Sequence, residues 1–140
     1  MSRGRSEQVT WERGKRRGSF TAEIDPEGTV LKGQYVQDRM DMGYVEIIWS
    51  NGTHYKGEFN GMTITGSGTC TYANGEKYTG LWMNGSQHGQ GAYTFVGGAV
   101  YEGGYTHNRR SGKGMLLYGG EVIKAGMWKN GVLVTPSVAV

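Results

Sequence analysis

Three histidines and one cysteine are the side chains of this 140-residue chain best suited to bind a metal or to act as bases and nucleophiles. His54, His88 and His107 are far apart in sequence, and no two have the short spacing of metal ligands on one element. Cys70 has no catalytic sequence context, and the chain contains no Gly-x-Ser-x-Gly segment. The sequence therefore predicts no metal site and no nucleophilic catalysis, and we expect His88 to fix its loop by hydrogen bonding.

A glycine-rich segment and several carboxylates are the other candidates for chemistry. Gly112-Lys113-Gly114 is the nearest match to a phosphate-binding loop, but the same glycine positions recur elsewhere without a lysine, and no helix follows. Glu58 and Glu102 occupy equivalent positions, where we expect cross-strand contacts with lysines such as Lys56. The sequence therefore predicts a chain that is not an enzyme and that binds no cofactor.

An internal repeat of 23 residues determines the elements that carry these side chains. Gly57, Gly80, Gly103 and Gly126 are 23 residues apart, and an aromatic residue follows each of them two positions later. Further columns with the same step are Gly66, Gly89 and Gly112; Gly68, Gly91 and Gly114; Gly52, Gly75 and Gly98; Trp49, Tyr72, Phe95 and Tyr118; and Tyr55, Tyr78 and Tyr101. A period of this size predicts small units that bury their apolar face only by stacking.

Alternation of residue types within a unit predicts β-strands. In residues 78–82 the tyrosine, glycine and tryptophan share one face of an extended strand, and residues 89–95 alternate in the same way. We expect a loop over residues 83–88, and tight turns with positive φ at Asn51-Gly52 and Asn74-Gly75. The predicted fold is all-β: an elongated, curved, single-layer antiparallel β-meander of stacked hairpins.

The glycines beside the aromatic residues have a physical explanation in such a sheet. A glycine on the neighbouring strand lets a ring lie over backbone, as in the rescue of strand glycines by aromatic residues. One layer can then hold together although only 36% of the residues are hydrophobic.

Length and composition indicate one domain without a membrane span or a secretory signal, because no stretch approaches 18 apolar residues and the N-terminus is polar. Cys70 lies on the predicted face of Gly66, Gly68 and Tyr72, so we expect a buried thiol and an intracellular location.

The net charge of +3 is concentrated at the start of the chain. Residues 1–18 carry a charge of +4 and the remainder −1, and the basic side chains of this segment are Arg3, Arg5, Arg13, Lys15, Arg16 and Arg17. Such an end is suited to an anionic lipid, a nucleic acid or an acidic protein surface, or is simply solvated.

One unit matches a known repeat pattern, Tyr-x-Gly-x-Trp-x-x-Gly-x-x-x-Gly-x-Gly, formed by Tyr78, Gly80, Trp82, Gly85, Gly89 and Gly91. This pattern resembles the MORN repeat, and the resemblance covers about residues 11–131. Departures occur at Val45, Met62, Thr65, Asn108 and Ser111. The resemblance implies stacked hairpins and a non-catalytic scaffold, typical of cytoskeletal assemblies, cilia and flagella, membrane-contact sites and motor complexes.

We accordingly divide the chain into a basic segment (1–10), a MORN-like array (11–131) without a fused catalytic domain, and an apolar tail (132–140) containing Pro136. We expect the tail to pack on the last repeat or to dock into a neighbour.

The first binding hypothesis is a cytoplasmic protein-interaction scaffold of a cytoskeletal, ciliary or flagellar assembly, either alone or as a homo- or hetero-oligomer. Aromatic residues are enriched in binding hot spots. The candidate groove residues are Tyr55, Phe59, Tyr78, Trp82, Tyr101, Tyr105 and Trp128. The alternative for these rings is that they only pack the repeat itself.

The second hypothesis is a peripheral contact with anionic lipid or phosphoinositide through basic loop residues. The candidate patch is Lys15, Arg16, Arg17, Arg109, Arg110 and Lys113. A nucleic-acid partner is not expected, because these residues alternate poorly with exposed aromatic side chains.

Overall fold

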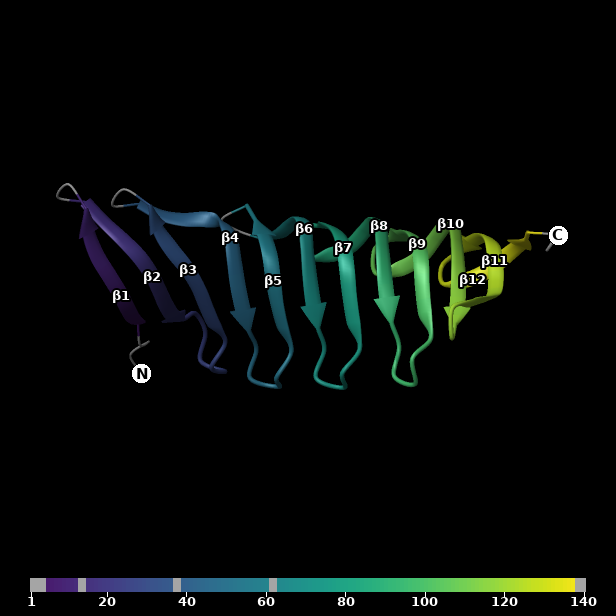
Figure 1. Cartoon of the computed structure of the whole chain (residues 1–140), viewed down its shortest axis with the longest axis horizontal. Coiled ribbons are helices and arrows are strands. Elements are labelled where there is room, and N and C mark those ends of the chain that lie inside the picture. Colours follow the sequence, from purple (N-terminus) through teal and green to yellow (C-terminus); the bar gives the residue numbers. More distant parts are fainter. Residues whose placement is uncertain (1–4, 13–14, 37–38, 61–62, 138–140) are drawn as a thin grey trace.

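The chain forms one open sheet of twelve antiparallel strands, each paired with its neighbours in sequence (Figure 1). This computed structural model describes residues 5–12, 15–36, 39–60 and 63–137, with side chains over 18–34, 43–60 and 63–137. None of the described residues is helical, so the described part contains no helix that could cross a membrane. The predicted all-β, single-layer antiparallel meander is confirmed.

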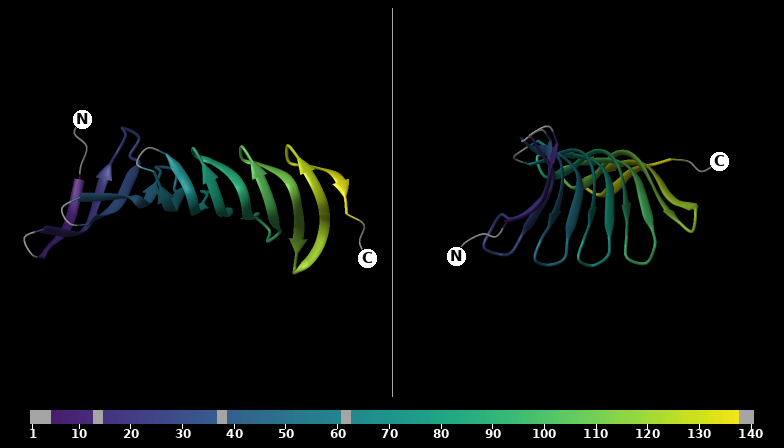
Figure 2. Two further views of the ribbon diagram at one scale, coloured as in Figure 1. Left: turned by 90° about the horizontal axis from the view of Figure 1, so that it is seen from above. Right: turned by 60° about the vertical axis from the view of Figure 1, so that its left-hand side comes forward.

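The strands are β1 (Arg5–Glu12), β2 (Lys15–Glu23), β3 (Val30–Val36), β4 (Arg39–Ile48), β5 (His54–Phe59), β6 (Ile64–Thr71), β7 (Lys77–Met83), β8 (Ser86–Thr94), β9 (Val100–Thr106), β10 (Arg109–Tyr118), β11 (Glu121–Lys129) and β12 (Val132–Pro136). Figure 2 shows that the hairpins stack in a common orientation and that the sheet they form is bent rather than flat.

The hairpin turns lie at the two ends of the strands, along the two long sides of the sheet, and each side has its own kind of turn. At one edge, which we call the narrow edge, Asn84-Gly85 has φ values of 50° and 84°, the positive pair of a two-residue type I′ turn. His107-Asn108, with 48° and 68°, forms the same turn, so the departure at Asn108 preserves the repeat's geometry because asparagine tolerates this conformation. The loop predicted over residues 83–88 is therefore only this turn.

At the opposite, wide edge the prediction of turns was correct in place but wrong in conformation. In the Asn51-Gly52 and Asn74-Gly75 turns the glycines alone have positive φ, of 93° and 91°. Asn51 instead accepts a hydrogen bond from the Thr53 amide through its side chain, at 2.9 Å. The turn has three residues between Trp49 and Thr53, whose backbones are joined at 2.8 Å, so one left-handed glycine suffices.

A bulge in the strands accounts for the Gly66, Gly89 and Gly112 column. Gly66 and Gly89 have φ of 109° and 90°, and the register slips beside them, between Gly57 and Phe59 and between Gly80 and Trp82. A bulge bends its strand and increases the local twist. The column therefore gives the sheet its curvature.

Stacked aromatic rings form the core on one face of the sheet, which we call the aromatic face. Tyr55, Tyr78 and Tyr101 are completely buried. Each hydroxyl donates to a backbone carbonyl three residues later, at 2.6 Å for Tyr55 to Glu58 and 2.8 Å for Tyr78 to Leu81. Other members of the core include Phe20, Leu31, Val45, Ile47, Trp82, Tyr105 and Trp128.

Glycine makes room for these rings, as the sequence indicates. Gly80 and Gly91 pair across β7 and β8, and a Cβ atom on Gly91 would overlap the phenol of Tyr78. Gly68 stands in the same relation to Tyr55. The ring lies on bare backbone, so one layer of strands can bury it.

Two local predictions need revision or completion. Among the described side chains Glu58 has no ion pair with a lysine, and its carboxylate accepts the Ser67 amide at 3.0 Å beside the bulge. In the tail, β12 pairs with β11 and ends at Pro136, and Leu133 packs against the core.

Candidate functional site

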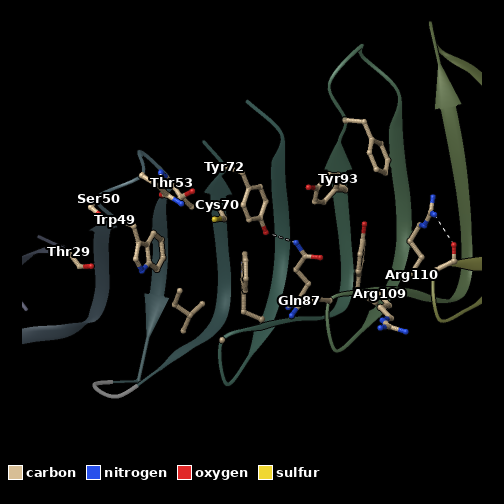
Figure 3. Close-up of a pocket in the computed structure, with 18 of the residues that line it drawn as sticks. Thr29, Trp49, Ser50, Thr53, Cys70, Tyr72, Gln87, Tyr93, Arg109 and Arg110 are labelled. Atoms are coloured by element: carbon tan, nitrogen blue, oxygen red, sulfur yellow. Dashed lines mark hydrogen bonds between the residues drawn. The ribbon is translucent and has the colours of Figure 1, made fainter. Parts of the chain in front are cut away.

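A long groove of about 940 Å³ crosses the aromatic face from the β2–β3 turn to β10 (Figure 3). It is lined by residues of several hairpins, so no single unit makes it. Its principal lining residues are Asp25, Glu27, Trp49, Ser50, Ile64, Cys70, Tyr72, Gln87, Tyr93, Phe95, Arg109 and Arg110. We use the term long groove for this surface.

A row of half-buried rings lines the wide-edge side of the long groove. Trp49, Tyr72 and Phe95 are 23 residues apart and directly follow β4, β6 and β8 respectively, so each unit contributes one ring. Tyr93 stacks on Tyr72 with ring centroids 5.9 Å apart. The groove therefore offers aromatic surface at regular intervals along the array.

The column Ile64, Gln87 and Arg110 places three different chemistries at one position of the repeat. All three residues line the long groove, each near the start of the second strand of its hairpin. Their carbonyls accept hydrogen bonds from the amides of the next narrow-edge turn, at 2.8 Å from Gly85 to Ile64 and 3.0 Å from Asn108 to Gln87. The backbone is thus fixed by the repeat while the side chain changes from apolar to amide to cation.

The middle of the long groove is polar but uncharged on its floor. Gln87 is buried and donates to the Tyr72 hydroxyl at 2.7 Å. Burial raises the pKa of Tyr72 and of Tyr93 above the usual value, so both phenols stay neutral far above physiological pH. Glu76 on the rim accepts the Tyr93 hydroxyl at 2.7 Å, and this hydrogen bond lowers the pKa of its carboxyl.

Charges of opposite sign occupy the two ends of the long groove. Asp25 and Glu27 lie at one end, in the β2–β3 turn, and hydrogen bonding to Thr29 lowers the pKa of Asp25. Arg109 and Arg110 lie at the other end, at the start of β10. The groove is therefore electrically polar along its length.

Arg110 is held by its own repeat. Its guanidinium lies 4.7 Å from the centre of the Trp128 ring and 5.9 Å from that of Phe95, and it donates to the Gly131 carbonyl at 2.8 Å. Cation–π contact and this hydrogen bond orient the charge at the groove end.

The three tryptophans whose side chains the structure describes divide into two kinds. The indole nitrogens of Trp82 and Trp128 donate to the carbonyls of Gly68 and Gly114, at 3.1 and 2.9 Å. The indole of Trp49 has no acceptor among the residues that the structure describes, and its ring lines the long groove. Within the described part of the chain, the N–H of Trp49 is therefore a donor that a bound molecule could use.

The candidate groove rings from the sequence lie mainly in the core below this surface. Tyr55, Tyr78 and Tyr101 are fully buried, and Trp82, Tyr105 and Trp128 are at most 6% exposed, while Phe59 is half-buried. Tyr78 contacts Trp82 and Tyr105 edge-on at 5.1 Å each, which explains the burial. Only Trp82 and Tyr105 of this set line the long groove.

The sequence missed the outer lining for a physical reason. Trp49, Tyr72 and Phe95 keep the repeat period and so look like framework, although they sit beside the turns where the core ends. The signal available was the column at 64, 87 and 110, where the residue type changes while its neighbours repeat.

The candidate basic patch is divided between two faces. Arg110 pairs with Tyr105 on the aromatic face, whereas exposed Lys113 precedes Gly114, which faces Tyr101, so Lys113 points to the opposite face. Arg109 is exposed at the narrow edge. Lys15, Arg16 and Arg17 begin β2, and their side chains lie outside the described residues.

Histidines and cysteine show no catalytic arrangement among the described side chains. His88 and His107 come closer than their sequence separation suggests, with ring centroids 5.7 Å apart. The hydrogen bond expected of His88 stays a prediction. Within the described residues no group of three or more metal-ligating side chains converges. Cys70 is buried as predicted, and burial raises the pKa of its thiol.

Comparison with protein families identifies the repeat. The model described as MORN repeat matches three consecutive segments, residues 55–77, 78–100 and 101–120. These segments cover β5 to β10 and most of the long groove. A search of curated proteins found no match to the chain.

Proposed function

Because residues 55–120 make this chain a MORN-repeat protein, of a repeat type that is non-catalytic and generally mediates protein or membrane interactions, we propose that it is a protein-interaction scaffold without enzymatic activity. The partner on this proposal is a segment of another protein that lies along the long groove.

The groove itself carries the proposal. It has about 940 Å³ of open volume, crosses several repeats and is lined by partly exposed rings that no second layer of the fold covers. Extended apolar clefts with a few placed polar groups are the usual form of binding sites. The column at 64, 87 and 110 varies the floor of this cleft, where buried Ile64, buried Gln87 and partly exposed Arg110 occupy the same backbone position, and we infer that this variation contributes to specificity.

A display library of random peptides tests this proposal on the full chain. We expect enriched peptides to bind the wild type and to lose binding to a double variant of the groove ends, Glu27→Lys with Arg109→Glu, which keeps the net charge. The matched control is Glu102→Lys with Lys113→Glu, two exposed residues of the opposite face. No enriched peptide, or equal loss in both variants, contradicts the proposal.

We infer less support for the anionic-lipid alternative, because Lys113 lies on the opposite face of the sheet from Arg110, so the basic residues of β10 do not form one patch. Sedimentation with anionic vesicles at low and physiological salt tests it. Salt-sensitive binding that is lost when Lys15, Arg16 and Arg17 become glutamate would favour the membrane hypothesis instead.

The cellular setting belongs to the same proposal. We place the partner in a cytoskeletal, ciliary or flagellar assembly or a motor complex, on the family resemblance alone. Affinity purification from native cells, with the groove-end double variant as control, identifies the partner, and a diffuse distribution of the tagged chain contradicts this placement.

A further inference from the structure

We propose that the occupant of the long groove is a proline-rich segment in the polyproline II conformation, with a basic residue at one end and an acidic residue at the other. This inference rests on the proposed function and specifies the partner's chemistry. Three features of the groove support it: the spacing of its rings, an indole donor that has no acceptor among the described residues, and the opposite charges at its ends.

The spacing of the rings matches the period of this helix. Trp49, Tyr72 and Phe95 recur every two strands, and neighbouring strands are about 4.8 Å apart, so the rings recur about every 9.6 Å. A polyproline II helix has three residues per turn with a rise of about 3.1 Å, so equivalent side chains recur about every 9.3 Å. Each turn of the segment therefore meets one unit of the array.

Other conformations fit this spacing less well. Two turns of an α-helix advance about 10.8 Å, so the mismatch grows by more than 1 Å with each unit. A β-strand repeats one face about every 6.7 Å, and a segment lying across the strands of the sheet cannot extend its ladder. Polyproline II also has carbonyls without internal hydrogen bonds, and aromatic grooves recognise this preformed shape.

The indole of Trp49 supplies the donor that such carbonyls need. Unlike Trp82 and Trp128, it has no acceptor within the described residues, and it opens into the long groove. A proline-rich segment lacks most of its own amide donors, so a protein–segment hydrogen bond must come from the groove. Trp49 is therefore placed as the anchor of the segment.

The charges at the groove ends define the rest of the segment. The distance from β3 to β10 is seven strand spacings, about 34 Å, which a polyproline II segment spans with about 11 residues. A cation at one end then meets Asp25 and Glu27, and an anion at the other meets Arg109 and Arg110. Such complementarity fixes the direction of the segment and its register on the array.

Defined peptides of about 12 residues test the inference by fluorescence anisotropy with the full chain. The probe has proline at two of every three positions, leucine at the third, and arginine and glutamate at its ends, in both orders. Controls replace every proline by glycine, or both charged residues by serine. We expect one probe to bind at least about tenfold more tightly than its glycine and serine counterparts.

A single substitution addresses the anchor. Trp49→Phe keeps the ring and removes the N–H, and we expect it to weaken the probe about fivefold, the effect of one hydrogen bond. The same weakening by Tyr118→Phe, at the next position of this column but outside the groove, would indicate a non-specific effect.

The outcomes separate this inference from the proposed function. Equal binding of proline and glycine peptides overturns the polyproline II segment. If the random library yields groove-dependent peptides that are helical or show no enrichment in proline, the inference is wrong while the interaction function stands. If neither library nor probes bind, both fall.

Discussion

The buried framework and the groove lining of this sheet follow the same 23-residue period but use it differently. In the framework, each position repeats its chemistry: Tyr55, Tyr78 and Tyr101 are all buried over a glycine pair. In the lining, Ile64, Gln87 and Arg110 share a backbone position and differ in chemistry. Repetition therefore marks what the fold needs, and on the proposed function the variation within the repeat is what a partner would distinguish.

The backbone connections explain how the two regions coexist. The amides of the narrow-edge turns hold the carbonyls of the variable column, with Gly131 bonding to Arg110 at 3.0 Å as the last member. These bonds need no particular side chain on the acceptor residue. The lining can thus vary without loosening the hairpins.

The largest effect is expected from adding a side chain to the framework. Gly91→Val forces a branched side chain into the Tyr78 phenol and should lower the free energy of unfolding by about 3 kcal/mol or more, measured by chemical denaturation. Gly85→Asn is the control, because no atom lies near its Cβ position and asparagine tolerates its φ of 84°. Equal loss in both variants would contradict the close-packing explanation.

The second-largest effect is expected from alkaline pH, which should lower the free energy of unfolding by ionising the buried tyrosines. Burial raises the pKa of Tyr55 and Tyr78 to about 12, above the usual value near 10, because the charged phenolate is disfavoured. Their contribution is complete below pH 10 and is lost as the pH rises towards 12, at about 2 kcal/mol for each phenol.

Denaturation at pH 8 and at pH 11.5 measures this loss. Tyr78→Phe should be about 1 kcal/mol less stable at pH 8, because it loses the bond to Leu81, yet should show a smaller further loss at high pH. An unchanged pH dependence in this variant would show that Tyr78 does not control alkaline unfolding.

The two kinds of tryptophan offer a smaller test of the same contrast. Trp82→Phe loses the bond to Gly68 and should cost about 1–2 kcal/mol of stability. Trp49→Phe removes no bond among the described residues and should change stability by less than about 0.5 kcal/mol. Thermal unfolding of both variants measures the two losses of stability. A similar loss in the two variants would contradict the distinction between the buried framework and the groove lining.

The smallest stability change is expected within the variable column. Gln87→Ile places the residue type of position 64 one unit further along, on the same fixed backbone, and should cost no more than about 1 kcal/mol through the lost bond to Tyr72. Its effect should instead appear as an altered set of bound peptides in the display experiment. A large loss of stability would assign Gln87 to the framework.

Most of the fold could be predicted from the sequence, because glycine and aromatic columns with alternating faces leave few other structures. The glycine beds of Tyr55 and Tyr78 are local consequences of strand pairing and were correctly expected. The conformations of Asn51 and Asn84 were not, because both precede glycine and only the register of the surrounding strands decides which turn has two residues and which has three.

The sequence predicted the aromatic character of the candidate site but not the residues that line it. An aromatic surface was expected, but the rings chosen were those of the core, since sequence periodicity does not show how far each ring lies beneath its neighbours. The proximity of His88 and His107, and the separation of Lys113 from Arg110 by the thickness of the sheet, depend equally on pairing across hairpins.

The sequence by itself thus determined a MORN-type meander, its period and the need for glycine beneath Tyr55, Tyr78 and Tyr101, because these follow from chemistry repeated within a unit. Only the tertiary structure decided which rings line the long groove. It also decided that acidic side chains lie at one end of that groove and basic side chains at the other. The physical reason is the stacking of the hairpins: the bulges bend successive units and bring side chains from different repeats onto a common surface.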